Sequence, residues 1–324
     1  MKEFIKGSGS VKSVAFSLKL HLPAGLLMPL LALFISLPLG AVARAETGRV
    51  VIIGVDGLYP AGIEAANTPV MDEICKTGAC SFEVRSVLPT KSSPNWASIF
   101  TGAAPEQHGV TSNRWKREKH SIEPVTKGAE EIFPSLFGLM REQKPDAVIG
   151  LSYEWKGFAR LVEASLADMN ETGRDAEGTT VTAEAFIRER KPDFLFVHLD
   201  MVDHAGHKHE WGSEPYIEAV ELADALIGRL LQAGREAGLD KSITWMIAAD
   251  HGGVGKEHGG ESMAELLTPL LISGYNIRPG VRITDPVNVY DIGATAAFLL
   301  DIELPAAAIG RPVCGALQNT ACGE

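Results

Sequence analysis

Val50-Val51-Ile52-Ile53-Gly54-Val55 is a continuous apolar run rich in β-branched residues, and Asp56-Gly57 ends it. Such a run is typical of a strand covered on both faces, which is the position of a central strand in a parallel sheet. The runs at 194–199 and 243–249 have the same character, and helical patterns separate them. This alternation predicts an α/β fold with a doubly wound, mostly parallel central sheet and helices on both faces.

The remaining elements follow from the spacing of apolar residues. An apolar stripe predicts that the longest helix covers 214–237 and stops at Gly238. The other predicted helices are 94–102, 135–143, 179–190 and 291–300, and the other predicted strands are 82–87, 147–153 and 269–273. Neither a repeat nor a Ser/Gly linker divides the chain, so 46–324 is expected to form a single domain.

The first 45 residues differ from the rest of the chain. Lysines precede an apolar stretch at roughly 22–40, and Ala43-Arg44-Ala45 follows as an A-x-A cleavage pattern. We interpret 1–45 as a signal peptide cleaved near Ala45, which predicts a secreted or periplasmic protein without a stable membrane span. An uncleaved anchor is the alternative, although prolines interrupt the stretch and it is short for a span.

Charge narrows the range of partners. Residues 1–45 carry a net charge of +4, so the −11 of the whole chain leaves −15 for 46–324. A surface this acidic argues against a nucleic-acid polymer as partner and against a polybasic membrane patch. A small anionic substrate is still compatible, because divalent cations invert the local field at a site. The sequence favours no particular oligomeric state.

The chain has four cysteines, Cys75, Cys80, Cys314 and Cys322. Export permits disulfides, and four cysteines allow three pairings. Short sequence separation favours Cys75–Cys80 and Cys314–Cys322.

Acidic residues and histidines gather where the predicted strands end. Ligands of doubly wound sheets bind beyond the carboxyl ends of the strands, so these side chains are expected at one edge of the sheet. Carboxylates and imidazoles without thiolates suit zinc sites with open positions, and six ligands are enough for two sites. The set is Asp56, Asp203, His207, Asp250, His251 and His258.

The local sequence around these residues fits ligation. We expect Gly206 to permit a tight backbone between Asp203 and His207, and Gly252-Gly253 to supply the irregular strand end that two adjacent ligands need. The alternative is that each strand-end aspartate is a helix N-cap or a turn residue. The nearby His198, His204 and His209 are interpreted as solvated or core residues.

A serine-rich turn, Pro89-Thr90-Lys91-Ser92-Ser93-Pro94, opens the helix predicted at 94–102. Pro94 suits the first helical position, which makes Ser93 the expected N-cap. Ser92 would then stand just outside the helix, where its alkoxide gains from the helix dipole and from a metal ion. Thr90 lies further back and is a candidate substrate contact. Metals with a serine at a helix start indicate a hydrolase of phosphate or sulfate esters.

The segment from Pro89 to Val110 resembles the nucleophile segment of nucleotide pyrophosphatase/phosphodiesterases, a branch of the alkaline phosphatase superfamily. Its Pro-Thr-Lys-Ser-Ser-Pro-Asn matches the family's P-T-K-T-F-P-N, and Thr-Gly-Ala-Ala-Pro-Glu-Gln-His-Gly matches T-G-x-x-P-E-x-H-G. The strand-end residues also fall in the family's order. The resemblance implies an α/β/α sandwich, a catalytic domain over 46–324, and two zinc ions.

The resemblance also implies a role for each residue. One zinc ion takes Asp203, His207 and His258, and the other takes Asp56, Asp250, His251 and the nucleophile. Ser92 stands where the family usually has its threonine nucleophile. Asn113 matches an asparagine that donates to a phosphoryl oxygen.

Departures from related enzymes bear on the substrate. Sulfatases of the superfamily have C/S-x-P-x-R, and Trp96 stands here in place of that arginine. Some monoesterases have a Lys-x-Arg clamp, whereas Trp155-Lys156-Gly157-Phe158 lacks the arginine, which favours diesters unless Arg114, Lys116 or Lys156 substitutes. Only six residues separate His251 from His258, where larger relatives have an insertion. Selectivity is therefore expected from 111–134 and 153–178.

The main hypothesis is an exported two-zinc phosphodiesterase that acts on a small phosphate ester through a phosphoserine. A phosphomonoesterase on the same scaffold is the alternative, and a metal-binding protein without catalysis is the third hypothesis. Nucleotides, phospholipid head groups and glycerophosphodiesters all fit as substrates. Trp96, Trp115 and Trp155 are candidates for stacking on a base, with core or rim packing as the alternative.

Overall fold

Eight strands form one sheet in the order β4-β3-β5-β1-β6-β7-β2-β8 in the computed structural model, which describes residues 48–318 and Cys322. The predicted signal peptide and its cleavage site lie outside the described residues. The strands are β1 (Arg49–Val55), β2 (Ala79–Arg85), β3 (Ile149–Tyr153), β4 (Met169–Thr172), β5 (Phe194–Leu199), β6 (Ile243–Ala248), β7 (Leu267–Gly274) and β8 (Val281–Arg282). Only β7 runs antiparallel to its described neighbours, so the sheet is mostly parallel, as predicted.

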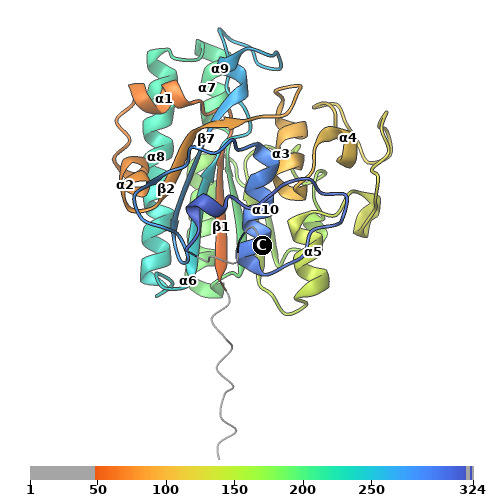
Figure 1. Ribbon diagram of the computed structural model, residues 1–324. Coiled ribbons are helices and arrows are strands. Elements are labelled where there is room, and N and C mark those ends of the chain that lie inside the picture. Colours follow the sequence, from red (N-terminus) through yellow and green to blue (C-terminus); the bar gives the residue numbers. More distant parts are fainter. Residues whose placement is uncertain (1–47, 319–321, 323–324) are drawn as a thin grey trace, which may run out of the picture. The chain divides into compact units, whose positions relative to one another are not determined.

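Helices cover both faces of the sheet (Figure 1). They are α1 (Pro60–Ala65), α2 (Pro69–Thr77), α3 (Ser92–Thr101), α4 (Pro105–His108), α5 (Leu136–Gln143), α6 (Ala176–Arg190), α7 (Met201–His209), α8 (Glu214–Glu236), α9 (Met263–Leu266) and α10 (Val289–Leu300). Short 3₁₀ turns cover Ala129–Glu131, Ala164–Leu166 and Cys314–Ala316.

Two hydrophobic cores flank the sheet because successive side chains of a strand point to opposite faces. In β1, Val50 and Ile52 join the core under α3, α5 and α10. Val51 and Ile53 join the core under α2, α6 and α8. The continuous apolar run of β1 therefore serves both cores, and the predicted three-layer α/β/α sandwich is confirmed.

The register of the central strands brings their carboxyl ends to one level. Val55 of β1 pairs with Leu199 of β5, and Gly54 pairs with Ala248 of β6. The N–H of Asp56 continues the ladder by donating to the carbonyl of Leu199, over 2.9 Å. The chain after each of these strands therefore starts from the same edge of the sheet.

Seven elements were not predicted from the sequence: α1, α2, α4, α7, α9, β4 and β8. Helix α7 matters most, because Asp203 and His207 lie on it rather than in a loop. Its Gly and His residues are weak helix formers, and packing against α8 outweighs that propensity. The start of α6 is also earlier than predicted, at Ala176, since the Asp175 carboxylate caps the helix by accepting from the N–H of Gly178.

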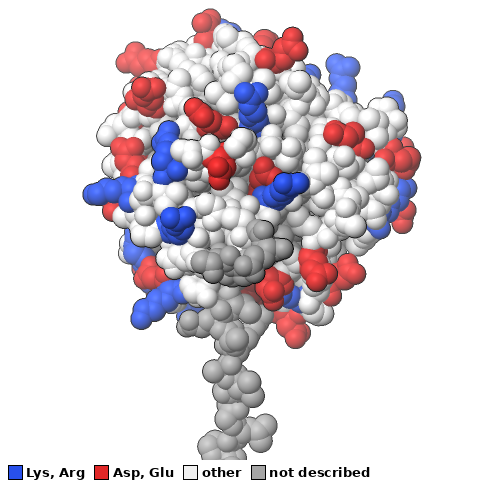
Figure 2. All heavy atoms as spheres, viewed as in Figure 1, with Lys and Arg blue, Asp and Glu red and all other residues white. Residues whose placement is uncertain are grey.

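The two disulfides join Cys75 to Cys80 and Cys314 to Cys322, which is the pairing that sequence separation favours. Among the described residues, no helix is both long and apolar enough to cross a membrane. Acidic and basic side chains are interspersed over the face shown in Figure 2.

A buried carboxyl joins α5 to the segment after β3. Glu163 is fully buried and accepts hydrogen bonds from the N–H and the hydroxyl of Ser135, the N-cap of α5. Burial raises the pKa of Glu163 from 4.5 to about 7, even though the hydrogen bonds from Ser135 act in the opposite direction. Folding therefore favours the protonated carboxyl.

This raised pKa predicts a pH-dependent stability. The contribution of Glu163 is fully present below about pH 4.5 and is lost as the pH rises through about 7, at a cost of roughly 3 kcal/mol in the free energy of unfolding. Urea unfolding at pH 5 and pH 8 measures it. Glu163→Gln should remove most of that difference, whereas the exposed Glu189→Gln should keep it. Equal pH dependence in both variants would contradict the assignment.

Candidate functional site

The six predicted ligand residues lie together at the carboxyl edge of the sheet. Asp56 follows β1, and Asp250 and His251 follow β6. Asp203 and His207 are one turn apart on α7, and the loop after β6 brings His258 back over the same edge. Among the described residues, three groups have ligand atoms within 4.8 Å of one another. Two consist of predicted ligands, Asp203, His207 and His258, and Asp56, Asp203 and His251, and the third is Asp56, His198 and Asp200.

Asp250 joins the second group through its neighbour, because its Oδ2 lies 3.2 Å from Nε2 of His251. The same Nε2 lies 3.4 Å from Oδ1 of Asp56. Asp203 lies between the two groups, with Oδ2 at 3.5 Å from Nε2 of His207 and Oδ1 at 3.8 Å from Nε2 of His258.

The three histidines of the cluster are oriented in the same way. Each Nδ1 lies 2.8 Å from a backbone carbonyl: His207 from that of Lys256, His251 from that of Gly252, and His258 from that of Thr90. A carbonyl only accepts, so each Nδ1 carries a proton, and each Nε2 faces a carboxylate of the cluster. This is the arrangement in which backbone partners hold imidazoles for metal ligation.

The carboxylates crowd negative charge into a buried space. Burial raises the pKa of Asp250 well above its ordinary value, and the charges of Asp56 and Asp203 raise it further. Burial also raises the pKa of Asp203, with additional contributions from Asp56 and Asp200. By contrast, burial lowers the pKa of His251 to about 3, which keeps the imidazole neutral. Neutral imidazoles beside crowded carboxylates suit divalent cations.

Three buried carboxylate oxygens have no hydrogen-bond partner among the described residues: Oδ1 of Asp56, Oδ1 of Asp203 and Oδ2 of Asp250. All three face the histidine Nε2 atoms. Buried oxygens without partners are costly unless something else satisfies them, and cations would do so. The residues present therefore fit a two-cation site.

Two residues outside the predicted set orient Asp56. Its Oδ2 accepts from the indole Nε1 of Trp96 over 2.9 Å and from Nε2 of His198 over 3.0 Å, and both side chains are fully buried. Burial lowers the pKa of His198, but the hydrogen bond to Asp56 and the negative charges of Asp56, Asp200 and Glu154 together outweigh it and raise the pKa. With Oδ2 occupied, only Oδ1 is available for a cation.

The interpretation of His198 as a plain core residue missed this contact. Its position on β5, beside β1, would have suggested it once the strand order was known. His204 and His209 are exposed, in agreement with their interpretation as solvated residues. Trp96 and Trp115 are buried, so among the three candidate stacking residues only Trp155 is partly exposed.

Ser92 is the first residue of α3, and its Oγ lies 3.4 Å from Nε2 of His251. The prediction that Ser93 is the N-cap was wrong. Lys91 takes the N-cap position with an extended backbone, and Pro94 lies two residues into the helix. Asn95 stabilises this earlier start, because its amide bonds the backbone of Val87 and of Lys91.

Asn113 lies against the start of α3. The N–H of Ser93 donates to its Oδ1 over 2.8 Å, which fixes the orientation of the amide. Its Nδ2 has no acceptor among the described residues, so it is free to donate. The hydroxyl of Thr90, the candidate substrate contact, donates to the carbonyl of Gly260 and accepts from the N–H of Gly259, and so holds the His258 loop.

Two glycines allow close approach around α7. Gly57 has a φ of +70°, and a Cβ there would lie 2.8 Å from Cα of Asp203. A Cβ on Gly206 would lie 2.7 Å from the indole of Trp211. The expected role of Gly206 in a tight loop was therefore wrong, since it makes room for Trp211 on a regular helix.

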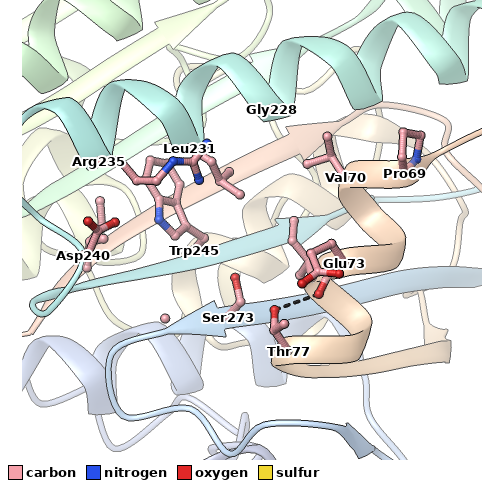
Figure 3. Close-up of a pocket in the computed structure, with 13 residues that line it drawn as sticks. Pro69, Val70, Glu73, Thr77, Gly228, Leu231, Arg235, Asp240, Trp245 and Ser273 are labelled. Atoms are coloured by element: carbon pink, nitrogen blue, oxygen red, sulfur yellow. Dashed lines mark hydrogen bonds between the residues drawn. The ribbon is translucent and has the colours of Figure 1, made fainter.

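A cavity of about 530 Å³ lies elsewhere, between α2 and α8 and beside the first residues of β6 (Figure 3). Its lining includes Val70, Glu73, Leu231, Arg235 and Trp245, and none of the six clustered residues. We assign it no part in the candidate site.

Trp96→Phe tests the orientation of Asp56. Removing one of two donors to Oδ2 should weaken the binding of a divalent cation, with zinc as the probe, by about 10- to 100-fold while the ring volume stays largely filled. Competition with a chromogenic chelator measures the affinity. Trp245→Phe, in the cavity of Figure 3, is the matched control and should leave zinc affinity unchanged. If the two variants bind zinc alike, the indole of Trp96 has only a packing role.

Comparison with known proteins gives this geometry a context. The family model described as type I phosphodiesterase / nucleotide pyrophosphatase matches residues 50–270. Mouse ectonucleotide pyrophosphatase/phosphodiesterase family member 1 is 26% identical over 193 residues, 57% of this chain and 21% of that protein. Venom phosphodiesterase 2 of Crotalus adamanteus is 22% identical over 225 residues, 65% of this chain and 27% of that protein. The matched region is thus about a quarter of each relative's length.

Solved structures share the fold at low identity. Murine ectonucleotide pyrophosphatase/phosphodiesterase 5, in an inactive form in complex with AMP, superposes with a TM-score of 0.67 at 15% identity, over 80% of this chain and 96% of that one. Wild-type alkaline phosphatase PafA superposes with a TM-score of 0.72 at 12% identity, over 86% of this chain and 100% of that one. The chain belongs to the type I phosphodiesterase / nucleotide pyrophosphatase family.

Proposed function

We propose that the protein is an exported phosphodiesterase that cleaves a small phosphate ester with two zinc ions and a phosphoserine on Ser92. The observation that carries the proposal is the hydroxyl of Ser92, at the start of α3 and 3.4 Å from His251 in the carboxylate–imidazole cluster. Membership of a phosphodiesterase family supports ester hydrolysis as the reaction. The AMP bound by a structural neighbour makes nucleotides the first substrates to test.

The ligand roles follow from the geometry and from the resemblance to the family. One ion would be held by Asp203, His207 and His258, and the other by Asp56, Asp250, His251 and Ser92. When bound, zinc supplies positive charge that stabilises a serine alkoxide and a leaving oxygen, and it lowers the pKa of water to about 7.

The chain's own groups have defined tasks in this proposal. Oγ of Ser92 attacks phosphorus as the bond to the leaving oxygen breaks, and water then cleaves the phosphoserine. Nδ2 of Asn113 donates to a non-bridging oxygen, because its Oδ1 is already held by the N–H of Ser93. The dipole of α3 adds positive potential where charge accumulates.

Export is supported by the disulfides and by the pattern of the first 45 residues. Both disulfides lie outside the cluster, and disulfides persist in oxidising compartments. Localisation of the full chain, with and without residues 1–45, tests this part of the proposal.

Ser92→Ala should lower the turnover of a nitrophenyl phosphodiester by roughly 10³-fold or more. Zinc content should stay near two per chain, and acid-quenched enzyme should lose its phosphoryl adduct by mass spectrometry. Ser92→Thr keeps a hydroxyl and should keep measurable turnover. Ser98→Ala, on the same helix, is the control. If the wild-type protein binds zinc but hydrolyses none of the esters, the non-catalytic hypothesis is favoured. If Ser92→Ala still hydrolyses the diester, Ser92 is not the nucleophile.

Asn113→Ala should lower kcat by about 10²- to 10³-fold, because it removes a donor to the charge that develops on the phosphoryl group. Steady-state kinetics on the same diester measures this loss. Asn170→Ala, on β4, removes an exposed amide and should have no effect. A loss confined to KM would mean that Asn113 only helps to bind the substrate.

A further inference from the structure

Two segments without long helices meet beside the start of α3: one around Asn113 and one around Arg160. Arg117 binds them together, because its guanidinium donates to the carbonyls of Arg160, Ala159 and Val162. Glu130 pairs with the same guanidinium. The backbone that carries Arg160 is therefore held in place by the opposite segment.

The side chain of Arg160 reaches from this anchored backbone to the candidate site. Its Nη2 lies 3.0 Å from Oγ of Ser93 and 3.0 Å from the carbonyl oxygen of Asn113. Ser93 adjoins the proposed nucleophile, and Asn113 carries the proposed phosphoryl donor. The charge of Arg160 thus lies against the residue next to Ser92 and against the backbone of Asn113 itself.

The guanidinium is also preorganised. It lies over the indole of Trp155, with Cζ 5.1 Å from the ring centroid, and its Nε is buried without a partner among the described residues. Stacking and burial reduce the freedom of the side chain and weaken the screening of its charge. Lys156, two residues beyond Glu154 on the same segment, is exposed instead.

We propose that Arg160 is a specificity-determining residue that recognises the second negative charge of a terminal phosphate. This inference rests on the proposed function of Ser92 and Asn113. The contacts to Ser93 and Asn113 use Nη2, which leaves donors of Nη1 for a further oxygen. A phosphodiester at the transferred group carries one negative charge and a monoester carries two near neutral pH, so the fixed cation favours the monoester. The site would then cleave diesters and also retain monoesters or bind the phosphate product.

The test compares Arg160→Gln with the wild-type enzyme on nitrophenyl phosphate and on a nitrophenyl phosphodiester. The loss in kcat/KM should be about 10- to 100-fold greater for the monoester, as expected for losing a charged hydrogen bond. Inhibition by inorganic phosphate should weaken by a similar factor. Arg160→Lys restores the charge and should recover part of the phosphate inhibition. Arg174→Gln, an exposed arginine paired with Asp175, is the control.

The outcomes separate this inference from the proposed function. Equal losses on both substrates would overturn it, because Arg160 would then only position Ser93 and Asn113. The inference would also be overturned if Lys156→Gln changed the ratio of kcat/KM for the monoester to kcat/KM for the diester more than Arg160→Gln does. Turnover by Ser92→Ala would instead contradict the proposed function. The role of Arg160 would then still be measured by comparing the affinity for inorganic phosphate of Ser92→Ala with that of the double variant Ser92→Ala/Arg160→Gln.

Discussion

The accumulation of buried carboxylates at one edge of the sheet is the constraint on which the rest of the site depends. Asp56, Asp203 and Asp250 are held close together. Burial raises the pKa of Asp203 and of Asp250, and repulsion from neighbouring carboxylates raises both further. Burial also raises the pKa of Asp56, but the hydrogen bonds from His198 and Trp96 and the charges of His198 and His251 together outweigh it and lower that pKa to about 2. A site built in this way stores unfavourable electrostatic energy that bound cations would relieve.

The central layer of the fold could be predicted from the sequence because its strands are buried on both faces. The runs of β1 and β5 gave their bounds without error, since they are apolar apart from Arg49 at the start of β1 and the buried His198 in β5. Short elements were missed because their local sequence patterns are weak. Helix α1 has six residues and α7 has several weak helix formers, so tertiary packing rather than local preference decides their structure.

The grouping of the candidate site could be predicted because strand ends converge in parallel sheets. The residues that orient Asp56 could not be predicted. Trp96 donates to Asp56 from a helix that begins 36 residues further along the chain, and His198 does so from the adjacent strand. Both contacts depend on the strand order β5-β1-β6, which the sequence pattern does not specify. Arg160 was missed for the same reason, because two loops distant in sequence bring it to Ser93.

The short loop between His251 and His258 has a further consequence for selectivity. It turns tightly, with Val254 bridged to Glu257. Two of its carbonyls are bonded to other parts of the protein: that of Gly255 accepts from the backbone N–H of Trp211, and that of Lys256 accepts from Nδ1 of His207. A loop committed to holding His207 in place is poorly placed to enclose the leaving group of the proposed substrate. The anchored segments around Asn113 and Arg160 are then the parts of the described chain best placed to do so. Because Arg117 fixes both, substrate preference would depend on the charge presented by a rigid wall rather than on closure of a mobile loop.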